Sequence, residues 1–422
     1  MFSSSRTRAV TAAIAAVATV GLMTTACSSD NNGDARKGLA DHGPITFAMG
    51  KTDTDKLKPV IEKWNKAHPE EKVELKELAG EADAQRETLV QSVQSGSGEY
   101  DVMALDVTDT AAFAANQWIQ PLTSEMAVDT SKLLKPTVES AAYKGTLYAM
   151  PQNTNGQLLY RNTELAPEAP KNFGDLKKSC EKAKAQQKEC LTTQLKQYEG
   201  LTVNAAGFIE GWGGHILADD AKTPTVDTPE TKAGLKTMVD AYKDGTISKN
   251  SISASEEETY LAFTRGESAF AVNWPYMFAK GQDAGSQVKD KFEVQPIVGK
   301  DGVGVSTLGG YNNAINIHSE HKATAKDFIS FIVNEDNQRS FAEASFPPVL
   351  ASIYDDQEVI QKQPYMPALK TSLEHAKPRP VSPFYPAISK AVQDNAYAAL
   401  SSGKSIDDAT KDMKAAIETA GK

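Results

Sequence analysis

The chain has 422 residues, of which 40% are hydrophobic and 7% aromatic, and its formal net charge at pH 7 is −10. This length exceeds what one hydrophobic core typically serves, so we expect two lobes. The acidic balance opposes binding to phosphate backbones and argues against a nucleic-acid partner.

The N-terminus carries an export signal. Arg6 and Arg8 precede an apolar run of small residues over 9–23, and Thr24-Thr25-Ala26-Cys27 follows. This three-part order predicts a signal peptide over 1–26, because the run is shorter than the roughly twenty residues of a membrane span. Cys27 resembles the lipid-bearing cysteine of a bacterial lipobox, with Thr24 in place of the usual Leu. Plain secretion after Ala26 is the alternative.

The elements after the signal alternate between strands and helices. Residues 27–43 are polar and are expected to form a flexible tether to the lipid anchor. Strand-like runs at 45–49, 73–78 and 100–105 enclose helical patterns at 57–64 and 88–95. This order predicts an α/β fold with a mostly parallel sheet. Further helices are expected at 229–242, 323–334, 387–400 and 403–419, and 263–272 runs from a helix end into a strand.

Two cysteines remain if Cys27 carries a lipid. Outside the cytoplasm, Cys180 and Cys190 are expected to pair. The closed loop is short and should add about 2–3 kcal/mol of stability. A metal site is the competing interpretation, but two thiols with no adjacent His form a weak ligand set. We therefore predict a structural disulfide, no metal site and no cofactor.

Short motifs follow one another along most of the chain. They are YDVMALDV at 100–107, FAANQWIQPL at 113–122, LYAMP at 147–151, LLYR at 158–161, YEGLTVN at 198–204, Gly213-Gly214, FTRGESAF at 263–270, NWPY at 273–276 and LGG at 308–310. In this order they resemble the family 1 extracellular solute-binding proteins, which are the carbohydrate-binding proteins of bacterial ABC importers. The likeness is greatest to the trehalose/maltose-binding branch.

The resemblance implies a periplasmic-binding-protein-like fold of type II, with two α/β lobes, a hinge and a ligand cleft between the lobes. Lobe 1 is expected at 44–152 plus 309–348, and lobe 2 at 153–308 plus 349–422. Chain crossings are expected near 151–155, 306–310 and 346–350. Closure of the lobes around the ligand is a hinge motion. The implied protein is a monomer on the outer face of the cell membrane that hands its sugar to the permease subunits of the importer.

Charged candidates for the sugar site stand at the ends of strands. Asp53 follows the first strand and Asp106 ends a buried strand, which is the edge where α/β sheets place ligands. Either carboxylate could instead cap a helix. Arg379 lies between two prolines, and its family counterpart reaches into the cleft with a fork of donors. A solvent-exposed arginine is the alternative.

Amide candidates cluster near two expected crossings. Asn153, Asn155 and Gln157 suit hydroxyl recognition, although turn chemistry also explains Asn-rich loops. Gly310 and Tyr311 belong to a segment whose backbone amides can approach a ligand closely, and a plain turn is the alternative.

Aromatic candidates supply flat surfaces for the C–H faces of a sugar. Trp274 and Tyr276 follow a strand, and Pro275 holds Trp274 extended. Trp212 stands beside glycines and could stack on a ring or pack in the core. Asp109 falls where relatives often have Trp, so the platform of the first lobe differs here.

The alternatives to a binding protein are an enzyme and a surface adhesin. A secreted carbohydrate hydrolase needs two opposed carboxyl groups, and the sequence has neither a Gly-x-Ser-x-Gly nor a His-Glu-x-x-His motif. An adhesin needs no lobe crossings and no aromatic cleft. We expect a non-enzymatic receptor for a disaccharide or short oligosaccharide such as an α-glucoside, with a non-sugar solute as the remaining alternative.

Overall fold

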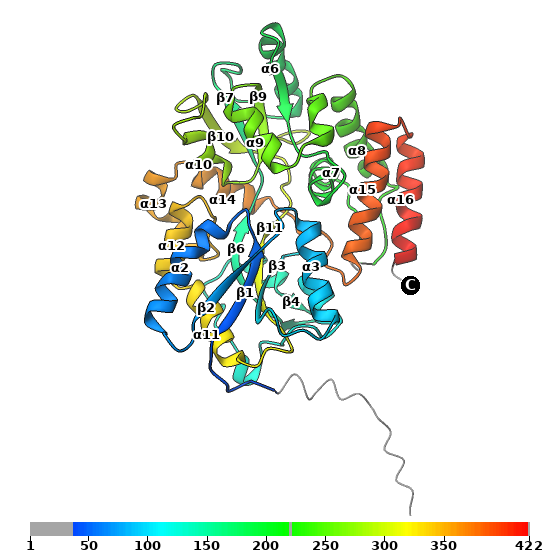
Figure 1. The fold of residues 1–422 in the computed structure, drawn as a ribbon. Coiled ribbons are helices and arrows are strands. Elements are labelled where there is room, and N and C mark those ends of the chain that lie inside the picture. The colour runs from blue at the N-terminus through cyan, green and yellow to red at the C-terminus, as the bar shows by residue number, and fades with distance from the viewer. Residues whose placement is uncertain (1–36, 219–221, 421–422) are drawn as a thin grey trace, which may run out of the picture.

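The protein forms two lobes, each built around its own sheet (Figure 1). The computed structural model describes residues 37–218 and 222–420. The expected signal peptide, Cys27 and most of the expected tether lie outside these residues. One sheet has the strand order β2-β1-β3-β11-β6 and the other β10-β7-β9-β8, as expected for a two-lobe α/β fold.

Lobe 1 encloses its sheet between two layers of helices. Its strands are β1 (Ile45–Gly50), β2 (Val73–Leu78), β3 (Val102–Asp106), β6 (Ala149–Asn155) and β11 (Gly309–Ile315). Phe47 and Met49 face α2 (Thr54–Ala67) and α11 (Lys322–Ile332), while Met103 and Leu105 face α3 (Ala82–Gln94) and α4 (Thr110–Ala115). Alternate strand residues are thus buried on opposite faces, as in sheets covered on both sides.

Lobe 2 is layered in the same way. Its strands are β7 (Leu158–Asn162), β8 (Glu189–Thr192), β9 (Ser268–Asn273) and β10 (Phe292–Pro296). One face is covered by α6 (Phe173–Ala185), α7 (Glu199–Gly211), α8 (Pro229–Lys243), α15 (Tyr385–Ser401) and α16 (Ile406–Ala420). The other face carries α9 (Glu256–Thr264), α10 (Met277–Gln282), α13 (Gln357–Lys362) and α14 (Met366–Glu374). The remaining elements are α5 (Lys135–Ser140), β4 (Ala142–Tyr143), β5 (Thr146–Leu147) and α12 (Glu335–Glu343), with 3₁₀ turns at Ser124–Met126, Lys249–Ser253 and Ala351–Asp355.

Both sheets are mixed rather than purely parallel. In lobe 1, β11 runs against both of its neighbours, and in lobe 2, β7 does so. Each of these two strands is the first after the chain crosses from the other lobe. The reversed strands are therefore the product of the crossings, and the remaining strands of each sheet share one direction, as predicted.

The crossings lie side by side and form the hinge. β6 pairs with β11 through Asn155, so the first crossing lies at 156–157, later than the sequence predicted. In the second crossing, the Leu308 amide donates to the Lys377 carbonyl at 2.8 Å. At the third, the Thr154 amide donates to the Pro347 carbonyl at 3.0 Å. The bond to Lys377 fixes the segment around that residue against the second crossing, and the bond to Pro347 ties the end of β6 to the third crossing. Among the residues described here, no helix is both long and apolar enough to cross a bilayer.

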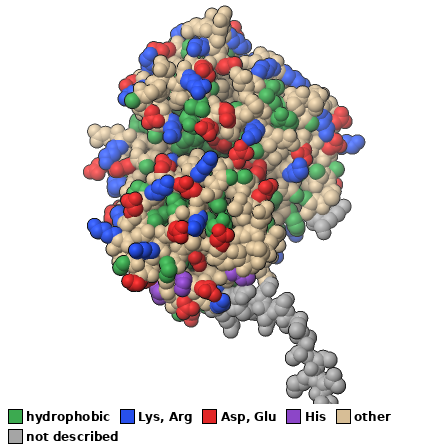
Figure 2. Space-filling model, viewed as in Figure 1, with side chains coloured by type: hydrophobic (Ala, Val, Ile, Leu, Met, Phe, Trp, Pro, Cys, Tyr) green, Lys and Arg blue, Asp and Glu red, His purple; other side chains and the backbone are tan. Residues whose placement is uncertain are grey.

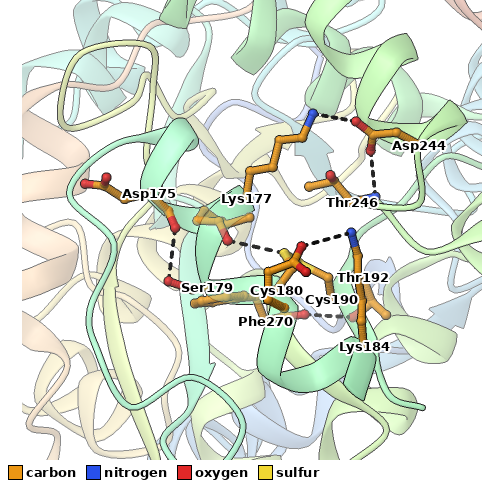
Figure 3. The surroundings of a disulfide bond; sticks show 12 residues. Asp175, Lys177, Ser179, Cys180, Lys184, Cys190, Thr192, Asp244, Thr246 and Phe270 are labelled. Carbon is orange, nitrogen blue, oxygen red and sulfur yellow. Dashed lines mark hydrogen bonds and ion pairs between the residues drawn. A yellow bond between two sulfur atoms is a disulfide. The ribbon is translucent and has the colours of Figure 1, made fainter. Parts of the chain in front are cut away.

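The predicted disulfide joins helix α6 to strand β8 (Figure 3). The Cα atoms of Cys180 and Cys190 lie 5.0 Å apart, and both side chains are buried. Beside them, the Lys177 ammonium contacts Asp244 at 2.5 Å and ties α6 to the end of α8. The bond thus lies within the core of lobe 2, away from the crossings.

Replacing both cysteines by alanine should lower the free energy of unfolding of lobe 2 by about 2–3 kcal/mol, because the unfolded chain gains loop entropy. Urea denaturation of the oxidised protein and of the variant measures the difference. Ligand affinity should be retained, since the bond lies inside one lobe. Equal stability of the two proteins would contradict a stabilising role.

Candidate functional site

Arg379 joins the two lobes beside the hinge. It precedes α15 and is only 4% exposed. Its Nη2 donates to Asp106 Oδ1 of lobe 1 at 2.9 Å, and its Nη1 donates to Glu199 Oε1 of lobe 2 at 2.6 Å. A planar guanidinium suits such two-sided bonding to carboxylates. The structure therefore brings together Asp106 and Arg379, two residues that the sequence singled out.

Glu199, at the start of α7, holds Arg379 from the other side. Its carboxylate also accepts hydrogen bonds from the Ser389 hydroxyl at 2.5 Å and from the Tyr385 hydroxyl. Burial raises the pKa of Glu199, and the positive charge of Arg379 opposes this rise. Buried polar groups with several partners hold a defined geometry. Glu199 therefore fixes the position from which Arg379 meets Asp106.

A second contact between the lobes caps helix α7 from the opposite lobe. Within the described residues, α7 has no side-chain cap from its own N-cap residue. Instead, Asp83 Oδ2 of α3 accepts a hydrogen bond from the Glu199 amide at 3.0 Å. A carboxylate at this end of a helix is favourable. Nearby, Lys196 contacts Glu81 at 2.5 Å. The lobes are thus closed onto each other, with α3 facing α7 (Figure 1).

Asp109 is a further buried carboxyl group on which the charges of this network act. It is 4% exposed, and its Oδ1 makes no hydrogen bond among the described residues. Burial raises the pKa of Asp109 to about 8, the charges of Asp106 and Glu199 act in the same direction, and Arg86 and Arg379 oppose them. Asp109 is therefore a buried carboxyl group beside this network.

Aromatic and acidic side chains form the other part of the cleft. Tyr311 on β11 lies opposite Asp106 on β3. Burial raises the pKa of Tyr311, and the charges of Asp53 and Asp106 add to this. Burial likewise raises the pKa of Tyr276, with Glu256 and Asp53 acting in the same direction. The charge of Asp53 acts on both tyrosines, so Asp53, Tyr276 and Tyr311 lie in the same region of the structure.

Trp274 lies between this group and the hinge. The edge of its ring comes within 3.1 Å of the position that a Cβ atom would take on Gly309. Its backbone carbonyl accepts a hydrogen bond from the Tyr160 hydroxyl at 2.9 Å. Glu256 accepts one from the Tyr198 hydroxyl at 2.6 Å, and Trp274 also hydrogen-bonds to Glu256. The indole is therefore held half-buried at the cleft.

The amide candidates near the first crossing take part in the pairing of β6 with β11. Asn153 is buried, and its Oδ1 accepts a hydrogen bond from the Tyr311 amide at 3.2 Å, where the register of β6 and β11 shifts. Gly310 has φ +121° and its carbonyl accepts a hydrogen bond from the Val107 amide. Asn155 pairs with Gly309. These residues shape the strands that carry the site, and contact of their side chains with a ligand stays a prediction.

Gln157 and Trp212 lie apart from the other candidates. They line a small pocket inside lobe 2 together with Asn204 and apolar side chains, and none of these residues belongs to the Arg379 network. The Trp212 ring packs against Phe173 and Phe208, with ring centroids 5.8 and 5.5 Å apart. The structure therefore uses Trp212 in packing, which was the alternative interpretation of its sequence context.

Several residues of the cleft escaped the sequence analysis: Glu81, Asp83, Arg86, Glu199 and Glu256. Glu199 lies within the 198–204 motif, yet nothing in that motif indicates that it would meet Arg379, 180 residues away. On the face of the molecule that Figure 2 shows, acidic and basic side chains are intermixed over both lobes. Over residues 37–218 and 222–420, no group of three or more His, Cys, Asp or Glu side chains is arranged to hold a metal ion.

Comparison with known proteins gives consistent matches over most of the chain. Residues 60–368 match the family model of bacterial extracellular solute-binding proteins. A probable ABC transporter-binding protein of Deinococcus radiodurans is 27% identical over 355 residues, which cover 80% of this chain and 83% of the relative. An arabinooligosaccharide-binding protein of Halalkalibacterium halodurans is 20% identical over 330 residues, covering 74% and 72%. The solved structure of maltose-bound T. maritima MalE3 superposes with a TM-score of 0.84 at 28% identity, covering 89% of this chain and 99% of that one.

Proposed function

The chain belongs to the family of bacterial extracellular solute-binding proteins, and we propose on this premise that it is the sugar receptor of an ABC importer. The ligand is a disaccharide or short oligosaccharide such as an α-glucoside. The receptor binds it unchanged between the lobes and presents the closed form to the permease subunits. It acts as a monomer at the outer face of the cell membrane, where a lipid on Cys27 anchors it.

The observation that carries this proposal is the composition of the closed cleft. Asp53, Asp106 and Arg379 offer charged partners for hydroxyl groups, while Trp274 and Tyr276 offer ring faces for C–H groups. The maltose bound to T. maritima MalE3 and the arabinooligosaccharide named for the second relative support a saccharide ligand. Micromolar affinity needs about 8 kcal/mol, which a few such contacts can supply.

A panel of maltose, trehalose, cellobiose and arabinobiose tests the proposal. The binding of one of them should raise the melting temperature of the purified protein, because it stabilises the native state alone. Calorimetric titration should then show one site per chain. Chromatography of the recovered sugar should return it intact, and a cleaved product would contradict a non-enzymatic receptor. If none of these sugars raises the melting temperature, the proposed class of ligand is wrong.

Trp274→Ala should weaken the binding of the identified sugar at least about tenfold, because stacking on a sugar ring and burial of the indole are lost together. Isothermal titration measures the change. Trp212→Ala is the matched control, since its partly buried ring packs against Phe173 and Phe208 of lobe 2, and it should lower stability with little change in affinity. An unchanged affinity of the Trp274 variant would remove this residue from the site.

A further inference from the structure

The closed cleft holds more negative than positive charge. The residues that face one another between α3, β3, α7 and the segment before α15 contribute five carboxyl groups and three cations: Glu81, Asp83, Asp106, Asp109 and Glu199 against Arg86, Lys196 and Arg379. Lys196 forms an ion pair with Glu81, and Arg86 forms one with Asp83. Arg379 forms ion pairs with both Asp106 and Glu199. Among the described residues, Asp109 is the carboxyl group of this set that no cation contacts within 4.0 Å, and the charges of Arg86 and Arg379, which other carboxyl groups share, act on it from further away.

Asp109 has the position of a ligand contact. It follows β3 at the edge where Asp106 ends the strand, and its charge acts on groups of both lobes. The charges that act on its carboxyl group are those of Arg86 of α3, Asp106 of β3, Glu199 of α7 and Arg379 before α15. It stands at the N-cap position of α4 but makes no side-chain cap bond. The side chain is 4% exposed, and its buried Oδ1 accepts no hydrogen bond from the described residues, so it has an unmet capacity for a hydrogen-bond donor.

A donor that also carries positive charge meets this need best. Enclosing five carboxyl groups with three cations in a closed cleft is costly, so closure over a neutral sugar favours the uptake of a proton. The raised pKa of Asp109, about 8, agrees with this requirement. An ammonium group brings the missing charge and three N–H donors in a compact form. With such a ligand bound, Asp109 would stay ionised and would not need to take up a proton when the cleft closes.

We propose that the cleft selects a saccharide that carries a primary amine, and that Asp109 pairs with its ammonium group. This inference rests on the proposed function, because it takes the cleft between the lobes as the sugar site. It narrows the substrate class from neutral sugars to aminated ones.

The decisive measurement compares maltose with analogues in which an amine replaces one hydroxyl at a time. Titrations at about pH 6.5 keep the amine protonated. At least one amine should bind about tenfold or more tightly than maltose, and its N-acetylated counterpart, which is neutral, should lose that advantage. The inference is overturned if no amine binds more tightly than both maltose and its own N-acetylated counterpart. Since maltose binding would persist in that case, the proposed function would stand.

The residue is tested by Asp109→Asn, which keeps the size of the side chain and removes its charge. The ratio of amine to maltose affinity should fall to about one. Asp301→Asn, at an exposed position of lobe 2, is the matched control and should keep the ratio. A ratio that is preserved in Asp109→Asn overturns the assignment of Asp109. If neither maltose nor any amine binds the wild-type protein, the inference and the sugar proposal for this panel fail together.

Proton uptake provides an independent readout. We expect opening of the cleft to hydrate Asp109 and to return its pKa towards the ordinary value, so that the closed form binds an additional proton between that value and about pH 8. Maltose affinity should therefore fall as pH rises, by up to about tenfold per pH unit, and level off above about pH 8. The affinity for the amine should be independent of pH up to about pH 7, because the ligand brings its own proton. A flat profile for maltose overturns the inference.

Discussion

Removing Arg379 by Arg379→Ala should weaken saccharide binding about a hundredfold or more. In the closed form, its guanidinium is the shared counter-charge of Asp106 and Glu199. Removing one partner from a buried ion pair costs about 3–5 kcal/mol, and about 1.4 kcal/mol corresponds to a tenfold change. The cost arises when the lobes close, because the open cleft hydrates both carboxylates. Calorimetric titration measures the affinity, and small-angle scattering should show that the unliganded variant is more open than the wild type.

A second buried arginine provides the control. Arg161 in β7 donates to the carbonyls of Ala166 and Pro167 at 2.6 and 2.7 Å, and all three residues belong to lobe 2. Arg161→Ala should therefore lower the stability of lobe 2 while its affinity for sugar changes little. If the two variants lose affinity equally, then Arg379 acts through general stability rather than by joining the lobes.

Local sequence patterns identify Asp106 and Arg379 but do not predict that the two residues meet. Strand-end chemistry identified Asp106, and the stiff Pro-Arg-Pro segment identified Arg379, 273 residues away. Each could be chosen on local grounds, because a carboxylate after a buried strand and an arginine between prolines are visible as patterns. Their contact could not be predicted from the pattern, because it depends on where the second crossing bonds to the segment around Lys377.

The limits are clearest where a residue has two possible roles. Asn153 was chosen for its amide, but its oxygen accepts the Tyr311 amide at a register shift that periodicity does not reveal. Trp212 stands next to glycines, as a stacking residue would, but Phe173 and Phe208 approach it from two different helices. The motif at 198–204 contains the start of helix α7 (Glu199–Gly211), which is buried by α8 and α15 and therefore lacks a clear polar face.

The sequence predicted the positions of strands β1 and β3 well, and the reason is physical. β1 and β3 are short apolar runs bounded by polar residues, because both faces of the lobe 1 sheet are covered. The reversed direction of β7 and β11 follows instead from the path of the chain between lobes. Local sequence indicates where a buried strand lies, whereas only the family resemblance indicated that the chain crosses between lobes.

Gly310→Ala should be the most destabilising single methyl addition at the hinge. The residue has φ +121°, which L side chains rarely adopt, and a Cβ atom would lie 2.3 Å from the Asn153 carbonyl oxygen and 2.8 Å from the Thr154 Cα. Backbone strain costs about 1–3 kcal/mol, and overpacking against backbone atoms adds about 1–3 kcal/mol. Urea denaturation should show the combined loss in lobe 1.

Gly145→Ala separates the two contributions. Gly145 also has a positive φ, +79°, but a Cβ atom there would meet nothing within 4 Å. This control should show the strain without the clash, and hence a smaller loss of stability than at Gly310. The Gly310 variant should also bind sugar more weakly, because the Gly310 carbonyl accepts the Val107 amide directly after Asp106. Equal stability losses in the two variants would mean that β6 and β11 can separate freely, and the hinge would then not hold Asp106 and Tyr311 in place.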